Sequence, residues 1–128
     1  VGLEILENPS LEVIDFNSLE TVDRIHIGVC AGTKGQARHD ALGELSGFSS
    51  LTTVQYLNIE GNEALMSADL LDSLAANGAP LPLRYATIRY NYLLSESAVH
   101  EQLDTLGVIA RDVCGNAGGD PECYCWVD

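Results

Sequence analysis

Polar residues recur at matching positions in five short segments that read as β-strands. Side chains alternate between the two faces of a strand, so these residues would share the outer face of a sheet whose inner face is apolar. Carboxylates, an imidazole, an amide, a hydroxyl and a guanidinium together offer both hydrogen-bond donors and acceptors. Such a surface can bind an extended ligand or a sugar, and it is also the pattern of an ordinary solvated sheet face. The candidate binding residues are Glu4, His26, Asn58, Thr87 and Asp112 in one column, with Glu60 and Arg89 beside it.

Catalytic patterns have little support in this sequence. It contains no nucleophile elbow, no phosphate-binding glycine loop and no pair of histidines at metal-ligand spacing. His26, His39 and His100 fall on different expected elements, and Cys30 near His26 has no evident orienting group. We therefore expect no catalytic residues, no cofactor and no metal.

An asparagine three positions after an apolar residue organises most of the chain. The unit recurs at Asn8, Asn62, Asn91 and Asn116, and a fifth copy that begins at Ile27 carries Cys30 in place of asparagine. An Asn side chain offers a donor and an acceptor to the backbone groups that a turning chain exposes. Four asparagines at one register in apolar surroundings predict a buried ladder of stacked side chains.

The apolar residues predict why the copies stack. Residues 16–27 match residues 48–59 at a shift of 32, and a period of roughly 20 to 35 residues is typical of a solenoid. A single coil cannot bury its own apolar face, so equivalent strands should pair in parallel. The expected inward columns are Leu3, Ile25, Leu57 and Ala86, and Ile5, Ile27, Ile59, Ile88 and Val113.

Two short helices are expected on the flank of this sheet. The first follows Ser67 and ends at Asn77-Gly78, and the second is capped by Ser95 or Ser97 and ends at Gly107. Their apolar residues have helical spacing and predict that the helices pack side by side. We also expect an exposed excursion over residues 28–47, with a short helix near 37–45, and a further strand over residues 11–16.

The asparagine series, with Asn8-Pro9-Ser10-Leu11 and residues 16–22, resembles the leucine-rich-repeat-like L domains of growth-factor-receptor ectodomains and of bacterial surface proteins. The resemblance covers roughly residues 1–116, as about five rungs, and leaves residues 117–128 as a Cys-rich cap or tail. It implies an α/β solenoid, a right-handed parallel β-helix of the leucine-rich-repeat kind, that is extracellular and used for recognition. Cys30 and the long insertion after it depart from the pattern.

Composition sets further bounds. With 128 residues and 46% hydrophobic content, the chain is expected to form one domain with a substantial core. A net charge of −13 disfavours nucleic acid and anionic membrane surfaces as partners. No stretch approaches the roughly 18 to 20 apolar residues of a transmembrane helix.

The cysteines predict a short disulfide near the end of the chain. Cys123 and Cys125 both lie within loop reach of Cys114, so either can pair with it in an oxidising compartment. Cys30 would lie three rungs from Cys114, about 14 Å away, which is too far for a disulfide. Cys30 is then either a buried side chain or the site of a disulfide bond to another chain.

Two metal sites are weaker alternatives to the expectation of no metal. They are zinc at Cys114, Cys123 and Cys125, and calcium at Asn116, Asp120 and Glu122.

Two functions fit these features. The first is a non-catalytic extracellular recognition or adhesion module that binds a protein or a carbohydrate at a cell surface. The second is a structural subunit whose copies stack end to end into a filament or surface assembly, which the uncapped first strand, the unmatched cysteines and the aromatic tail favour. Tyr85, Tyr90 and Tyr92 are expected to cluster near the fourth rung, and tyrosine is common at contact surfaces.

Overall fold

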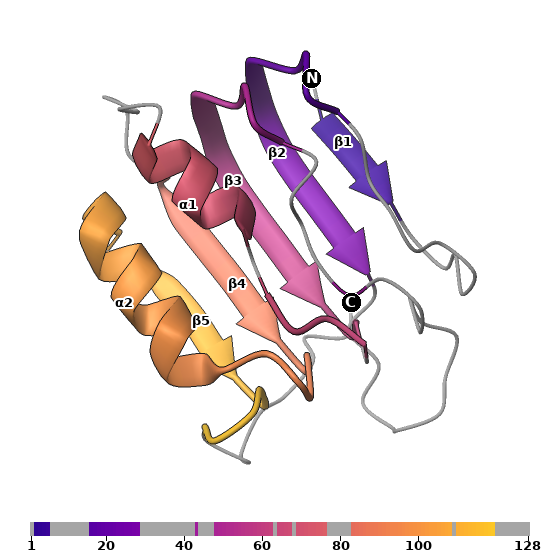
Figure 1. Cartoon of the computed structure of the whole chain (residues 1–128), viewed down its shortest axis with the longest axis vertical. Helices are drawn as coiled ribbons and strands as arrows, with labels where there is room; N and C mark the ends of the chain where they lie inside the picture. The colour runs from indigo at the N-terminus through magenta and orange to yellow at the C-terminus, as the bar shows by residue number, and fades with distance from the viewer. Residues whose placement is uncertain are drawn as a thin grey trace.

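A five-stranded parallel sheet forms the centre of the molecule, and each strand pairs with the next one along the chain (Figure 1). The computed structural model describes residues 2–5, 16–28, 43, 48–62, 64–67, 69–76, 83–108 and 110–119. The expected strand at 11–16, the helix near 37–45, Asn8, Cys30, Cys123 and Cys125 therefore lie wholly or mainly outside the described residues. The strands are β1 (Gly2–Ile5), β2 (Thr21–Gly28), β3 (Thr53–Glu60), β4 (Tyr85–Arg89) and β5 (Arg111–Cys114).

The strand register confirms both inward columns predicted from the sequence. Ile25 pairs with Leu3 and Leu57, and Ile59 pairs with Ile27 and Ile88. These β-branched and aliphatic side chains suit a pleated surface that is buried on one face. The last strand is short and spans Arg111–Cys114. The second strand is longer and already begins at Thr21.

Two helices lie on one side of the sheet, next to each other (Figure 1). They are α1 (Asp69–Ala76) and α2 (Glu96–Leu106). Leu70, Leu71 and Leu74 from α1 join the same core as the inward columns of the sheet, as do Val99 and Leu103 from α2. Full burial of each such side chain contributes about 1.5–3 kcal/mol. Across the two helices, the Gln102 amide donates a hydrogen bond of 3.1 Å to the Asp72 carboxylate.

The ends of α2 follow the predicted capping signals. Ser95, rather than Ser97, is the N-cap, and its hydroxyl accepts a hydrogen bond from the backbone of Ala98. Gly107 ends the helix with a φ of 75°, a left-handed conformation that favours glycine. Of the helices among the described residues, neither is long and apolar enough to cross a bilayer.

The internal repeat at a shift of 32 is visible as stacked side chains. The rings of Phe16 and Phe48 stack with centroids 5.9 Å apart. The next residue of each copy is paired as well, because Asn17 Oδ1 accepts hydrogen bonds from the backbone N and the hydroxyl of Ser49. The repeat seen in the sequence therefore corresponds to neighbouring segments in space.

Candidate functional site

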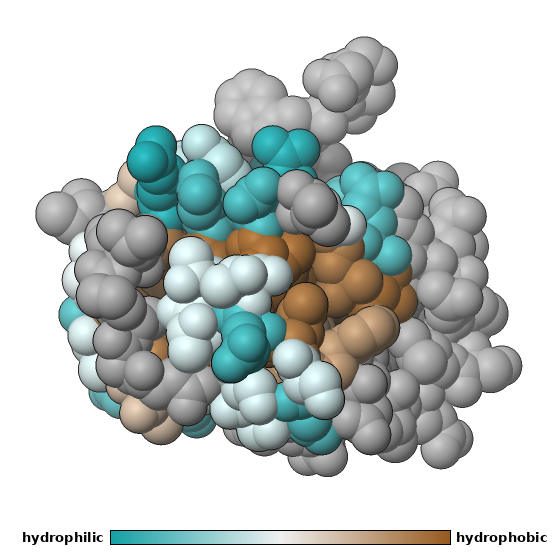
Figure 2. All heavy atoms as spheres, turned by 90° about the horizontal axis from the view of Figure 1, so that it is seen from above, coloured by the Kyte–Doolittle hydropathy of each residue, from teal (hydrophilic) through white to brown (hydrophobic). Residues whose placement is uncertain are grey.

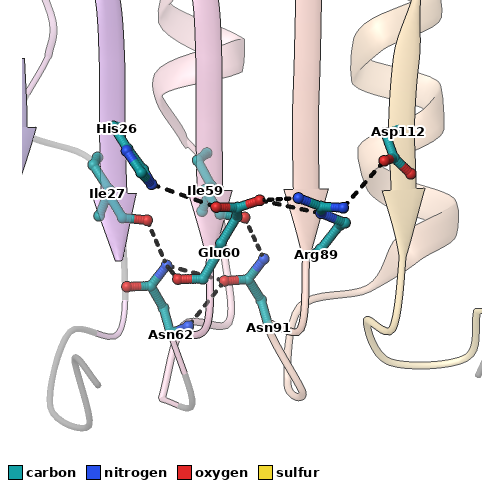
Figure 3. A network of polar contacts seen from close by, with 8 residues as sticks. All are labelled: His26, Ile27, Ile59, Glu60, Asn62, Arg89, Asn91 and Asp112. Atoms are coloured by element: carbon teal, nitrogen blue, oxygen red, sulfur yellow. Dashed lines mark hydrogen bonds and ion pairs between the residues drawn. The ribbon is translucent and has the colours of Figure 1, made fainter. Parts of the chain in front are cut away.

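The predicted asparagine ladder is present for three of its four members. Asn91 Oδ1 accepts hydrogen bonds from the backbone N (3.2 Å) and from Nδ2 (3.0 Å) of Asn62. Asn116 Oδ1 accepts the same two bonds from Asn91, each at 3.1 Å. Each Nδ2 also reaches a strand carbonyl, as Figure 3 shows for Asn62 with Ile27 and Asn91 with Ile59. The ladder thus satisfies buried backbone groups where β3, β4 and β5 end.

A glutamate that the sequence pattern did not single out continues the ladder beyond Asn116. Glu96, the buried first residue of α2, accepts hydrogen bonds through Oε1 from the backbone N (3.4 Å) and Nδ2 (3.1 Å) of Asn116. These are the two bonds that an asparagine of a following coil would accept. Glu96 also lies in the first turn of its helix, where a negative charge is favourable.

At the other end of the ladder, Asn62 packs against the end of β2. A Cβ atom on Gly28 would lie 2.9 Å from both Nδ2 and Oδ1 of Asn62. Among the described residues, buried Asn62 Oδ1 has no hydrogen-bond partner. In the sequence pattern, the preceding copy carries Cys30 in place of asparagine, and Cys30 lies outside the described residues.

Four charged side chains form a second line across the sheet, on the face opposite the core (Figure 3). This charged quartet consists of His26, Glu60, Arg89 and Asp112, one from each of the strands β2 to β5. Arg89 donates to Glu60 Oε1 through Nη2 (2.6 Å) and Nε (3.1 Å), and its Nη1 lies 3.3 Å from Asp112 Oδ2. His26 Nε2 is 3.4 Å from Glu60 Oε2, an ion-pair distance whose geometry falls short of a hydrogen bond.

The environment of Glu60 favours its charged form. Burial alone would raise the pKa of this carboxyl group, but the contacts with His26 and Arg89 outweigh burial and hold the pKa below its usual range. Glu60 and Arg89 are each only 5% exposed. A buried pair of this kind must stay paired, because removing one partner strands the other charge.

The quartet is therefore more enclosed than the solvated sheet face expected from the sequence. Of the seven predicted binding residues, Glu60, Thr87 and Arg89 are buried, so they offer little surface to a ligand. Glu4 is exposed, and His26, Asn58 and Asp112 are half-buried. The predicted register of Glu4, His26, Asn58, Thr87 and Asp112 is confirmed.

The more accessible part of the outer face lies two residues earlier in the strands. There Arg24 pairs with Gly2 and Tyr56, and Tyr56 pairs with Tyr85. Tyr56 and Tyr85 are 38% and 41% exposed, and Arg24 Cζ lies 5.4 Å from the centre of the Tyr56 ring. The candidate binding residues named from the sequence do not include this Arg24-Tyr56-Tyr85 row. The same alternation, read two residues earlier, identifies it.

A depression of about 620 Å³ opens beside the row, a size within the usual range of small-molecule sites. Gly2 contributes no side chain to its rung, which leaves space next to Arg24. Seen from above, at the end where the strands begin, hydrophobic residues form a band with hydrophilic residues on both sides (Figure 2). The residues lining this outer-face hollow are Gly2, Glu4, Asp23, Arg24, Gln55 and Tyr56.

The predicted tyrosine cluster is only partly present. The rings of Tyr90 and Tyr92 have centroids 6.4 Å apart. Tyr85 is the first residue of β4 and Tyr90 follows its last residue, so the strand separates them by about 16 Å at roughly 3.3 Å per residue. Tyr85 belongs instead with Tyr56. Tyr85 and Tyr90 are close in sequence but distant in space, because the extended strand β4 lies between them.

Metal binding gains no support among the described residues, which hold no group of three histidine, cysteine or acidic side chains that could share an ion. The calcium alternative relied on Asn116, whose Oδ1 already accepts two hydrogen bonds from Asn91.

Cys114 is buried and disulfide-bonded. The other three cysteines all lie outside the described residues, so the pairing with Cys123 or Cys125 stays a prediction.

Comparison with known proteins found no matching family model, no matching curated protein and no matching solved structure.

Proposed function

We propose that the chain is a non-catalytic recognition or adhesion module, built as a solenoid, whose ligand contacts the outer face of the parallel sheet. The sequential order of the strands and the asparagine ladder support the solenoid. The resemblance to L domains and the cysteine pattern support an extracellular or cell-surface location.

The observation that carries the recognition function is the exposed Arg24-Tyr56-Tyr85 row. Tyrosine and arginine are enriched among residues that dominate binding energy, because they combine large contact area with polar ends. On this face they come from three adjacent strands, whose backbone is fixed by the sheet. A rigid strand presents such side chains with little loss of conformational entropy when a ligand binds.

The charged quartet supports this division of roles. Its central pair is buried and mutually neutralised, which suits a structural contact between strands. The chemically accessible groups lie in the row and in the outer-face hollow. The outer face would therefore have a structural half at the ends of the strands and a recognition half at their beginnings.

End-to-end stacking into a filament is the weaker proposal. If a second copy of the chain stacked beyond β5, its asparagine would accept hydrogen bonds from the backbone N and Nδ2 of Asn116. Both of these groups already donate to Glu96. Stacking through that end would have to replace these bonds.

The test is a binding screen of the chain against extracellular protein domains and immobilised glycans. We expect at least one specific ligand, and a loss of binding of tenfold or more in Arg24→Ala and Tyr56→Ala. Gln102→Ala changes the helix side of the molecule and serves as the control. Equal binding by the outer-face variants, with loss in the control, would contradict the proposal.

A further inference from the structure

We infer that the outer-face hollow is a binding site for a neutral saccharide. The inference rests on the proposed function and narrows it to one class of ligand. It depends on three features of the hollow, which are its shape, the mixture of polar groups that line it and the aromatic ring at its side.

The shape follows from the missing side chain at Gly2. In the row that crosses the sheet, Arg24 and Tyr56 project outward from β2 and β3, but their neighbour on β1 has no side chain. The result is a recess open to solvent and bounded by Arg24, Tyr56 and Glu4. The structure does not require glycine at position 2, because a Cβ atom there would make only ordinary contacts of 3.7 and 3.8 Å with Arg24.

The lining matches hydroxyl groups better than it matches an ion. Glu4 supplies acceptors, Arg24 supplies donors, and the Gln55 amide supplies both, while the carboxylate of Asp23 already has a polar partner. A sugar hydroxyl donates and accepts, so one ring can satisfy all three kinds of group. An anion would face two carboxylates within a chain of net charge −13. A cation would face the guanidinium of Arg24.

An apolar ligand is also disfavoured. It would cover Glu4 and Arg24 without returning hydrogen bonds, and desolvating such groups is costly. A sugar avoids that penalty and still presents its C–H face to an aromatic ring. Tyr56, which lines the hollow and is 38% exposed, offers ring surface there.

Two test variants, each with a matched control, separate saccharide binding from a general effect on the fold. Gly2→Leu fills the hollow from its floor, whereas Gly2→Ala adds only one methyl group and serves as the matched control. Tyr56→Ala removes the ring. Tyr92→Ala removes a tyrosine of similar exposure at the opposite end of the strands and is its control.

The experiment is an NMR titration of the ¹⁵N-labelled chain with neutral oligosaccharides of hexose, N-acetylhexosamine and deoxyhexose units. We expect at least one of them to shift the amide signals of residues 2–4, 23–24 and 55–56, with affinity reduced tenfold or more in Gly2→Leu and Tyr56→Ala. Gly2→Ala and Tyr92→Ala should bind within about twofold of the original chain.

Two results would overturn the saccharide inference. One is that no oligosaccharide shifts these signals while a protein ligand from the binding screen does, which would leave the proposed function standing. The other is that a sugar shifts them but binds Gly2→Leu as well as the original chain. If every ligand instead maps to the helix side, the proposed function fails as well.

Discussion

Glu96 accepts from Asn116 the same pair of hydrogen bonds that Asn116 accepts from Asn91. The ladder therefore ends on a side chain that comes from a helix instead of from another turn. A carboxylate oxygen can replace the amide oxygen here because only acceptor capacity is required at the last position. This closes the asparagine ladder next to β5.

Replacing Glu96 tests this closure. Glu96→Ala would leave the Nδ2 and the backbone N of Asn116 without this acceptor, and we expect a loss of about 1–3 kcal/mol in the free energy of unfolding. Glu96→Gln keeps an acceptor oxygen and should lose less than half as much. Urea denaturation of the three proteins measures the difference. Equal losses in both variants would show that the charge, and not the acceptor, is what matters.

The ladder itself is tested at its central member. Asn91→Ala removes an acceptor for Asn62 and a donor to the Ile59 carbonyl, and should cost about 1–3 kcal/mol. Asn62→Ala should fall in the same range. Asn58→Ala, on the outer face of the same sheet, is the matched control and should change stability by no more than about 0.5 kcal/mol. A ladder variant as stable as this control would remove the ladder from the account.

Two glycines near the end of the chain separate backbone conformation from crowding. Gly115 and Gly118 have φ angles of 70° and 76°, but within the described part of the chain only a Cβ on Gly115 would meet a neighbour, 3.0 Å from the Tyr90 ring. We expect Gly118→Ala to lose about 1–2 kcal/mol from its left-handed backbone alone. Gly115→Ala should lose more, because Tyr90 must also move. Thermal denaturation that ranks them in the opposite order would contradict the packing described for Tyr90.

The charged quartet predicts a dependence of stability on pH. The contacts with His26 and Arg89 lower the folded-state pKa of Glu60 below the unfolded-state value, for which 4.5 is the reference. The stabilisation is then fully present above that pH and is lost as the pH falls through the lower folded-state pKa. Glu60→Gln should flatten the unfolding free energy between about pH 5 and pH 3 relative to the original chain. Curves of identical slope would show that Glu60 is not held in its charged form.

Much of the fold follows from periodicity in the sequence. Apolar residues such as Ile25, Leu57 and Ile59 recur at fixed offsets from the asparagines, so the columns and the strand register could be predicted. The helices follow from leucine spacing and from signals at their ends, of which Ser95 and Gly107 are the clearest. These features are local, or repeat at one period, and a single sequence contains them.

The parts that could not be predicted depend on contacts between unrelated positions. Glu96 precedes Asn116 by twenty residues and meets it only because α2 begins beside the end of β5. Alternation placed Glu60 and Arg89 on the outer face, but alternation does not determine how deeply a face is buried. The hollow beside Arg24 depends on the absence of a side chain at Gly2. A pattern of hydrophobic residues does not predict such a hollow.

The most direct test of the central claim measures binding and stability together for two outer-face residues. Tyr56→Ala changes the proposed recognition half and Glu60→Gln changes the structural half. For the ligand identified in the binding screen, we predict that Tyr56→Ala loses affinity tenfold or more while its unfolding free energy stays within about 1 kcal/mol. Glu60→Gln should lose stability and keep its affinity wherever it is folded. The opposite pattern, with binding lost in Glu60→Gln and unchanged in Tyr56→Ala, would contradict the account.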